Sequence, residues 1–106
     1  MREQLVGLWR TSDGPYACDW LLRDNGTFLA KITEGTRTIS RSVGKWSLSE
    51  NFLISEYILD DSGVIDAGCI DRDALLEVTN DHFLLRTTGG IQRRYKRVAD
   101  SEAIAR

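Results

Sequence analysis

The chain has 106 residues, with 14 Lys plus Arg against 16 Asp plus Glu and a formal net charge of -2. This length suits one domain, and the charge counts against a nucleic-acid-binding protein, which usually carries a basic excess. A hydrophobic share of 42% with 28% charged residues excludes a wholly disordered chain, and no apolar run reaches the roughly 20 residues of a membrane span. We predict one domain over residues 1–98 and a polar tail over 99–106, for which a short helix is favoured over a frayed end.

Short strands alternate with turn signals along the whole domain. Asn25-Gly26 is the strongest turn signal, because Asn-Gly readily adopts the positive φ angles of a tight hairpin turn. Gly44 is expected to mark a bulge inside a long strand. The predicted strands cover residues 5–10, 16–23, 27–33, 37–48, 52–59, 64–70, 74–79, 82–87 and 91–98.

Short connections decide the topology that these strands can form. Sequential strands joined by tight turns pair antiparallel, because a parallel crossover needs about a dozen or more residues. An antiparallel sheet of eight or nine strands curls, and closure removes its exposed edges. We therefore predict an all-β fold, a small up-and-down antiparallel β-barrel, with a two-sheet sandwich as the alternative.

One face of the strand predicted over residues 37–48 carries small hydroxyl side chains and a tryptophan. Ser40, Ser42 and Trp46 share this face by period-two alternation. We expect the face to point inward, because a buried tryptophan is more favourable than an exposed one. Inward hydroxyl groups would leave space and offer hydrogen bonds to a small molecule. The alternative is an ordinary polar outer face with one exposed tryptophan.

The ordered motifs of the chain resemble those of a known superfamily. They are Gly7-Leu8-Trp9, the hairpin Asp24-Asn25-Gly26-Thr27-Phe28, Gly44-Lys45-Trp46 and a basic last strand. In this set the chain resembles the calycins, and most closely the short lipocalin-like domains of bacteria. The resemblance implies that Trp9 plugs the closed end of a barrel, with Arg93 or Arg97 over its indole ring. It also implies a cavity inside the barrel that binds a small molecule.

Arg93 and Tyr95 resemble the Arg-x-Tyr carboxylate clamp of fatty-acid-binding proteins. Alternation places both on one face of the last strand, where a guanidinium and a phenol would hold an anionic head group if that face is interior. Two alternatives stay open. Arg93 closes the barrel end while Tyr95 packs in the core, or the last strand forms a basic edge exposed to solvent.

Signals for catalysis, metal binding and redox chemistry are poor. His82 is the single histidine, with no second histidine or paired cysteine near it to make a zinc site. Cys18 and Cys69 form no Cys-x-x-Cys pair and lie in apolar strand-like segments, so core packing is expected for both. We predict no catalytic residue, no metal and no cofactor. Asp60, Asp61, Asp71 and Asp73 are expected in turns or loops, whereas Asp66 lies within a predicted strand and is expected to face solvent.

These observations favour a non-enzymatic binding protein over an enzyme. The predicted ligand is small and apolar or amphipathic, with an anionic head group as one option. The alternative is a protein-interaction or structural module with a filled core, in which Leu21 and Leu29 form an outer patch and a homodimer can assemble. The expected compartment is the cytoplasm, or the periplasm or exterior if a leader was removed. The predicted ligand-binding residues are Trp20, Ser40, Ser42, Trp46, Tyr57, Arg93 and Tyr95.

Overall fold

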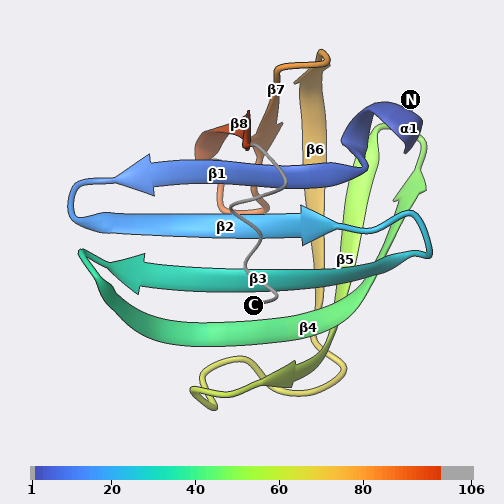
Figure 1. Ribbon diagram of the computed structural model, residues 1–106. Helices are drawn as coiled ribbons and strands as arrows, with labels where there is room; N and C mark the ends of the chain where they lie inside the picture. The colour runs from blue at the N-terminus through green and yellow to red at the C-terminus, as the bar shows by residue number, and fades with distance from the viewer. Residues whose placement is uncertain (1, 99–106) are drawn as a thin grey trace.

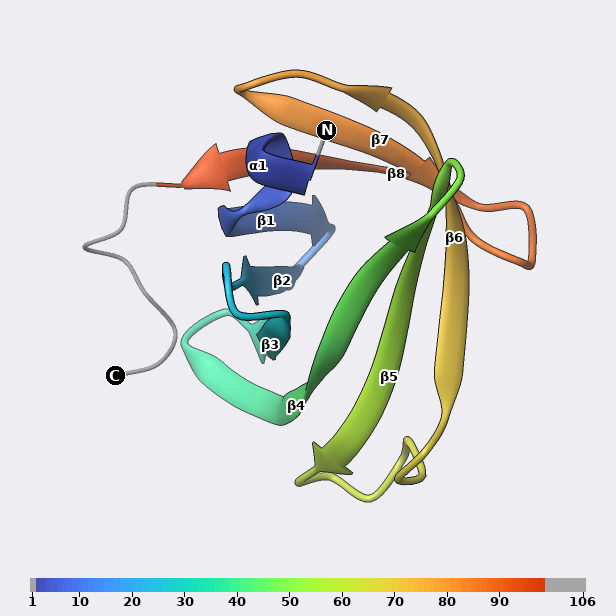
Figure 2. The same cartoon turned by 90° about the vertical axis from the view of Figure 1, so that its right-hand side faces the viewer.

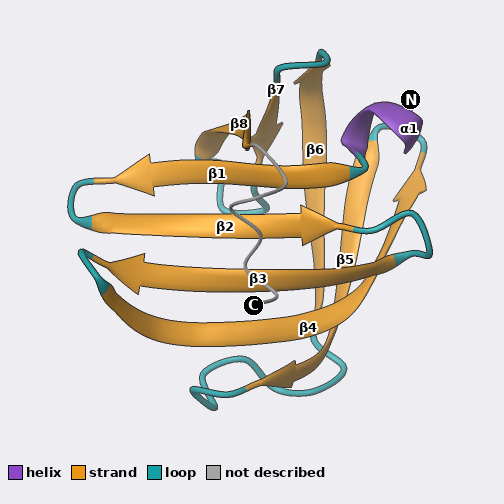
Figure 3. Cartoon of the chain, in the orientation of Figure 1, coloured by secondary structure: helices purple, strands orange, loops and turns teal. Residues whose placement is uncertain are grey.

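The computed structural model of the chain describes residues 2–98, and within them eight strands close into one barrel (Figure 1). Neighbouring strands are antiparallel throughout, and β8 pairs with β1 to complete the closure. One helical turn, α1 (Arg2–Leu5), precedes the first strand, so almost the whole domain is strand and turn (Figure 3). The strands are β1 (Gly7–Asp13), β2 (Tyr16–Leu22), β3 (Thr27–Glu34), β4 (Arg37–Ser49), β5 (Phe52–Asp60), β6 (Ile70–Val78), β7 (His82–Arg86) and β8 (Gln92–Val98).

The predicted up-and-down antiparallel barrel is confirmed, and the two-sheet sandwich is wrong. The tail predicted over residues 99–106 lies outside the described residues. No helix within residues 2–98 has the length and apolar character that crossing a membrane requires.

The predicted strand over residues 64–70 is wrong. Residues 61–69 form the connection between β5 and β6, and β6 runs unbroken through the segment predicted as a turn. The carboxylate of Asp60 accepts hydrogen bonds from the backbone N–H groups of Val64 (3.0 Å) and Ile65 (3.1 Å), which keeps these donors out of a strand ladder. Gly63 and Gly68 add positive φ angles of 75° and 87°, which a strand does not accommodate.

Gly44 marks a bulge, as predicted. The register between β4 and β5 shifts between Val43 and Gly44. A Cβ atom at Gly44 would overlap the carbonyl oxygen of Glu56 and the ring of Phe28. The absence of a side chain therefore lets β5 and the Phe28 ring approach the bend closely.

Apolar side chains fill the barrel at the end where β1 begins, and α1 lies at that end (Figure 1, Figure 2). Trp9 is fully buried there, and its indole Nε1 donates a hydrogen bond to the Leu5 carbonyl oxygen at 2.8 Å. The guanidinium of Arg97 lies 4.2 Å from the centre of the Trp9 ring and donates to the carbonyl oxygens of Val6 and Gln4. Arg97, rather than Arg93, thus holds the position over Trp9 that the resemblance implied.

Candidate ligand-binding cavity

The half of the barrel away from α1 contains a cavity of about 220 Å³. Its walls come from strands on opposite sides of the barrel, with β2 and β3 facing β5 and β6 (Figure 2). Side chains two residues apart on a strand point to the same side, so alternate residues of each strand face the cavity. The residues that line the cavity are Cys18, Trp20, Ala30, Ser55, Tyr57, Asp71, Asp73, Leu85, Thr87, Arg93 and Tyr95.

Aromatic rings separate this cavity from the apolar end of the barrel. The Trp20 ring lies 5.4 Å from the Tyr95 ring, and Tyr95 in turn stacks on Phe83 at 4.9 Å. The ring centres of Phe28 and Tyr57 lie 5.2 Å apart, and the two rings pack edge to face. Such ring pairs add about 0.5–1.5 kcal/mol each beyond the area they bury, so they stabilise this wall.

Two of the residues that line the cavity each have a buried polar atom with no hydrogen-bond partner within residues 2–98. These atoms are the indole Nε1 of Trp20, which is 6% exposed, and the hydroxyl of Ser55, which is 1% exposed. By contrast, the indole groups of Trp9 and Trp46 each donate to a backbone carbonyl at 2.8 Å. An unsatisfied buried donor costs about 1–3 kcal/mol, and few are left so in folded proteins. An acceptor atom of a guest molecule that reached either group would satisfy it.

Ser55→Ala is expected to leave the free energy of unfolding at or above that of the wild type, because the deleted hydroxyl is buried and unpartnered in the described structure. Ser42→Ala is the matched control, since the Ser42 hydroxyl donates to Asp60 Oδ1 at 2.8 Å. The control is expected to lose about 1 kcal/mol, the net contribution of a typical hydrogen bond. Urea unfolding of both variants measures the difference. An equal loss in the two variants would show that the Ser55 hydroxyl has a partner.

Three charged side chains line the cavity: Asp71 and Asp73 from β6 and Arg93 from β8. No ion pair in the described part of the chain joins Arg93 to either carboxylate. Burial raises the pKa of Asp73 to about 6, the negative charge of Asp71 adds to this shift, and Arg93 opposes it. With both carboxylates ionised, two negative charges face one positive charge, so the cavity carries an excess of negative charge.

The raised pKa of Asp73 predicts that stability falls as pH rises from 3.8, its ordinary value, through about 6. In this window the folded state binds more protons than the unfolded state, and deprotonation therefore disfavours folding. Asp73→Asn is expected to remove this part of the pH dependence. Urea unfolding of wild type and variant across the window is the measurement. Asp66→Asn, on the exposed β5–β6 connection, serves as the control and should keep the wild-type profile.

The remaining titratable groups at the cavity are neutral near pH 7. Burial raises the pKa of the Cys18 thiol to about 11, and the charge of Asp19 adds to the effect. Burial also raises the pKa of the Tyr57 and Tyr95 phenols. A neutral thiol and neutral phenols are poor nucleophiles, but they donate and accept hydrogen bonds. The arrangement thus suits recognition of a guest better than covalent chemistry.

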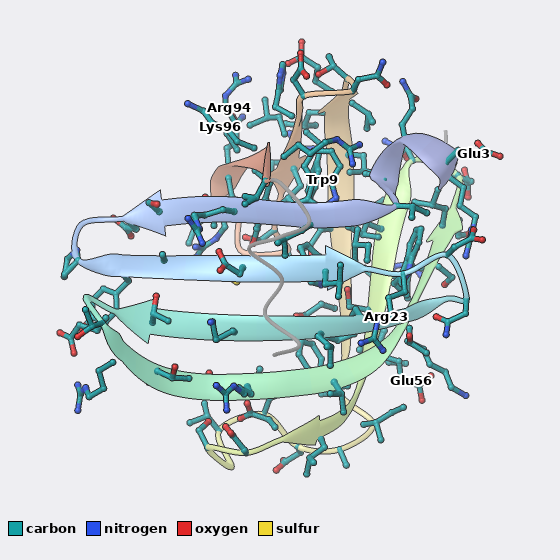
Figure 4. All side chains as sticks on the ribbon, viewed as in Figure 1. Glu3, Trp9, Arg23, Glu56, Arg94 and Lys96 are labelled. Atoms are coloured by element: carbon teal, nitrogen blue, oxygen red, sulfur yellow. The ribbon has the colours of Figure 1, made fainter. Side chains whose placement is uncertain are left out.

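Four of the predicted ligand-binding residues line the cavity, namely Trp20, Tyr57, Arg93 and Tyr95. Arg93 and Tyr95 share the interior side of β8, whereas Arg94 and Lys96 lie on its outer side (Figure 4). The last strand is therefore a cavity wall on one side and a basic surface on the other.

The structure does not bring the other three predicted residues, Ser40, Ser42 and Trp46, to the cavity. All three are buried, as the inward orientation of their face predicted. The Ser42 hydroxyl is engaged by Asp60, as described above. Trp46 belongs to the apolar end of the barrel, where the guanidinium of Arg2 lies 4.7 Å from the centre of its ring.

Ser55, Asp71 and Asp73 line the cavity but were not among the predicted site residues. Asp71 and Asp73 were expected in a turn between two strands, whereas both lie on the single strand β6. Their spacing of two residues was the available signal, because on one strand it places both side chains on the same face. The expectation for Cys69 is also wrong, since this residue is exposed on the β5–β6 connection and does not pack in the core.

The outer face carries the two leucines predicted to form a patch. Leu21 and Leu29 are direct neighbours across β2 and β3, and both are half-buried. The side chains of Leu59 and Val64 are more exposed and lie at the end of β5 and in the connection after it.

Residues 2–98 contain no group of three or more His, Cys, Asp or Glu side chains that could hold a metal ion. His82 lies outside the cavity, where its Nε2 is 2.7 Å from Glu77 Oε1, and this contact lowers the pKa of Glu77.

No protein-family model and no curated protein matches the chain. The closed, eight-stranded, antiparallel up-and-down barrel is accordingly the class that the structure establishes for residues 2–98.

Proposed function

We propose that the chain binds a small amphipathic molecule in the cavity of its barrel and does not catalyse a reaction. The observation that carries this proposal is the pair of buried, unpartnered polar atoms, Trp20 Nε1 and Ser55 Oγ, at one cavity. The resemblance of the ordered motifs to calycins supports the same site, because that superfamily binds ligands inside the barrel. A well-formed cavity with a few convergent polar groups is the usual form of a small-molecule site.

The size of the cavity limits the ligand. Its volume of about 220 Å³ lies below the range of about 300–1,000 Å³ that is common for drug-sized ligands. A single-ring compound or a short chain suits this space, whereas a long-chain lipid does not. The apolar part of such a ligand would contact the Trp20 and Tyr95 rings.

The charges at the cavity count against an anionic head group. Arg93 and Tyr95 do line one space, as a carboxylate clamp requires. Asp71 and Asp73 line it too, and they would repel an anion that approached Arg93. We therefore favour an amphipathic ligand without a net negative charge.

A protein-interaction or structural module with a filled core is the alternative that the sequence left open. The cavity counts against this alternative, because side chains fill only the apolar end of the barrel. A homodimer stays a prediction.

The test follows the indole N–H signals of the three tryptophans by NMR, with the Trp20 signal assigned from Trp20→Phe. Wild-type protein purified without refolding is first examined for bound mass by native mass spectrometry, and then titrated with 4-hydroxybenzyl alcohol as a probe. We expect bound mass or a probe-dependent shift of the Trp20 signal. No bound mass together with no shift would contradict the proposal.

Ala30→Phe is the variant that fills the cavity, since Ala30 lies on its wall. We expect this variant to lose the probe-dependent shift. Ala67→Phe makes the same change at an exposed position of the β5–β6 connection and should bind as the wild type does. If Ala30→Phe fails to fold, Ser55→Ala still tests the site, because it removes one of the two unpartnered donors and leaves the Trp20 indole signal as the readout.

A further inference from the structure

We infer that the ligand is a small amine, with its ammonium group beside Asp71 and Asp73 and a hydrogen-bond acceptor directed at Trp20 and Ser55. This inference rests on the binding function proposed above and names the chemical class of the ligand.

Two carboxylates without an ion-pair partner in the described residues lie close together at the cavity. Asp71 and Asp73 lie two residues apart on β6 and line the same cavity, so their charges are close together. Burial raises the pKa of Asp73, and the negative charge of Asp71 adds to this shift, as expected for two carboxylates that repel each other. Within residues 2–98 neither carboxylate has an ion-pair partner, and Arg93 offsets only one of the two charges. An ammonium group would relieve this repulsion and complete the charge balance.

The aromatic lining favours the same kind of ligand. Trp20, Tyr57 and Tyr95 all border the cavity. The faces of aromatic rings attract cations, with about 0.5–2 kcal/mol for a well-placed ammonium group, and give no such attraction to an anion. Rings together with carboxylates therefore favour a cation over a neutral or an anionic head group.

The unpartnered donors define the other end of the ligand. Ser55 and Trp20 are almost completely buried, Asp73 is half-buried and Asp71 is exposed. Ser55 lies directly opposite Asp71 across β5 and β6, whereas Trp20 belongs to β2 on the facing wall. A ligand whose ammonium group lies at the carboxylates and whose acceptor reaches Trp20 would span this small cavity.

Three probes of one size and different charge test the inference: 4-hydroxybenzylamine, 4-hydroxybenzyl alcohol and 4-hydroxybenzoate. Each has the same phenol oxygen as acceptor and differs in its head group. At about pH 7.5 the amine is protonated and Asp73, with a pKa of about 6, is ionised. We expect the amine to bind about tenfold more tightly than the other two, as one charge-assisted hydrogen bond predicts. Affinities come from the titration of the Trp20 indole signal.

Asp73→Asn removes one negative charge with little change in shape. We expect it to weaken binding of the amine about tenfold and to leave binding of the alcohol unchanged. Asp66→Asn removes the same charge from the exposed connection and should change neither affinity. Far-UV circular dichroism confirms that both variants keep the barrel.

The remaining outcomes separate this inference from the binding function itself. Equal or tighter binding of the alcohol would overturn the amine inference and leave the cavity as a binding site. Tightest binding of the benzoate would also overturn it, and would assign the head group to Arg93 instead. If no probe moves the Trp20 signal, the inference fails, and if the purified protein also carries no bound mass, the proposed function fails with it.

Discussion

Trp9→Ala is expected to lower the free energy of unfolding by about 3–5 kcal/mol, the usual cost of truncating a fully buried tryptophan. The substitution would empty the centre of the apolar end, where the Trp9 ring meets the edge of Phe83 at 4.8 Å. It would also remove the hydrogen bond to the Leu5 carbonyl and the ring beneath the Arg97 guanidinium. Denaturant unfolding followed by circular dichroism measures the loss.

Tyr16→Ala is the control for the Trp9 variant. Tyr16 is also aromatic and lies at the start of β2, but its side chain is 46% exposed. Its truncation therefore removes little buried contact. We expect a change of about 0.5 kcal/mol or less, as for most surface substitutions. Similar losses in the two variants would show that Trp9 has no special place in closing the barrel.

Gly44→Ala is expected to destabilise the barrel by roughly 1–3 kcal/mol, the usual cost of forcing an extra carbon into a packed site. The added Cβ would overlap the Glu56 carbonyl oxygen, which belongs to the backbone and cannot rotate away, and the ring of Phe28. Relief would require β4 and β5 to separate at the bulge. The same unfolding measurement applies.

Gly89→Ala provides the comparison for Gly44. A Cβ at Gly89 would meet Thr87 Oγ1 at 3.9 Å, which is an ordinary contact, and Gly89 lies in the β7–β8 turn. We expect this variant to stay within about 0.5 kcal/mol of the wild type. A loss in Gly89→Ala as large as in Gly44→Ala would assign the effect to glycine flexibility and not to crowding at the bulge.

Local sequence signals were sufficient for most of the fold, because short turns and period-two alternation act over a few residues. At the β2–β3 turn Gly26 adopts a positive φ of 86°, and Asn25 Oδ1 accepts the backbone N–H of Thr27 at 3.0 Å. Alternation also grouped Ser40, Ser42 and Trp46 on one face of β4, and the preference of tryptophan for burial favoured the inward orientation that the structure shows. With such turns between strands, an antiparallel meander is the topology that the chain can form.

Residues 64–70 show why a strand cannot be predicted from local composition alone. Its apolar, β-branched residues have the composition of a strand, but strand propensity depends on the partners that tertiary structure supplies. Asp60, which also binds the hydroxyl of Ser42 from β4, holds the backbone of Val64 and Ile65 in a loop. The turn that was expected around Asp71 and Asp73 consequently became part of β6.

The sequence by itself favoured an antiparallel barrel and placed Arg93 and Tyr95 on one face of the last strand, since alternation acts within a strand. The structure decided that this face lines the interior cavity. Only the tertiary structure decided which arginine covers Trp9, because that depends on the register between β1 and β8, where Trp9 lies opposite Arg97. It also decided which buried donors lack a partner and which charges share the cavity. Those properties arise between strands that are distant in the chain, and closure of the barrel brings them together.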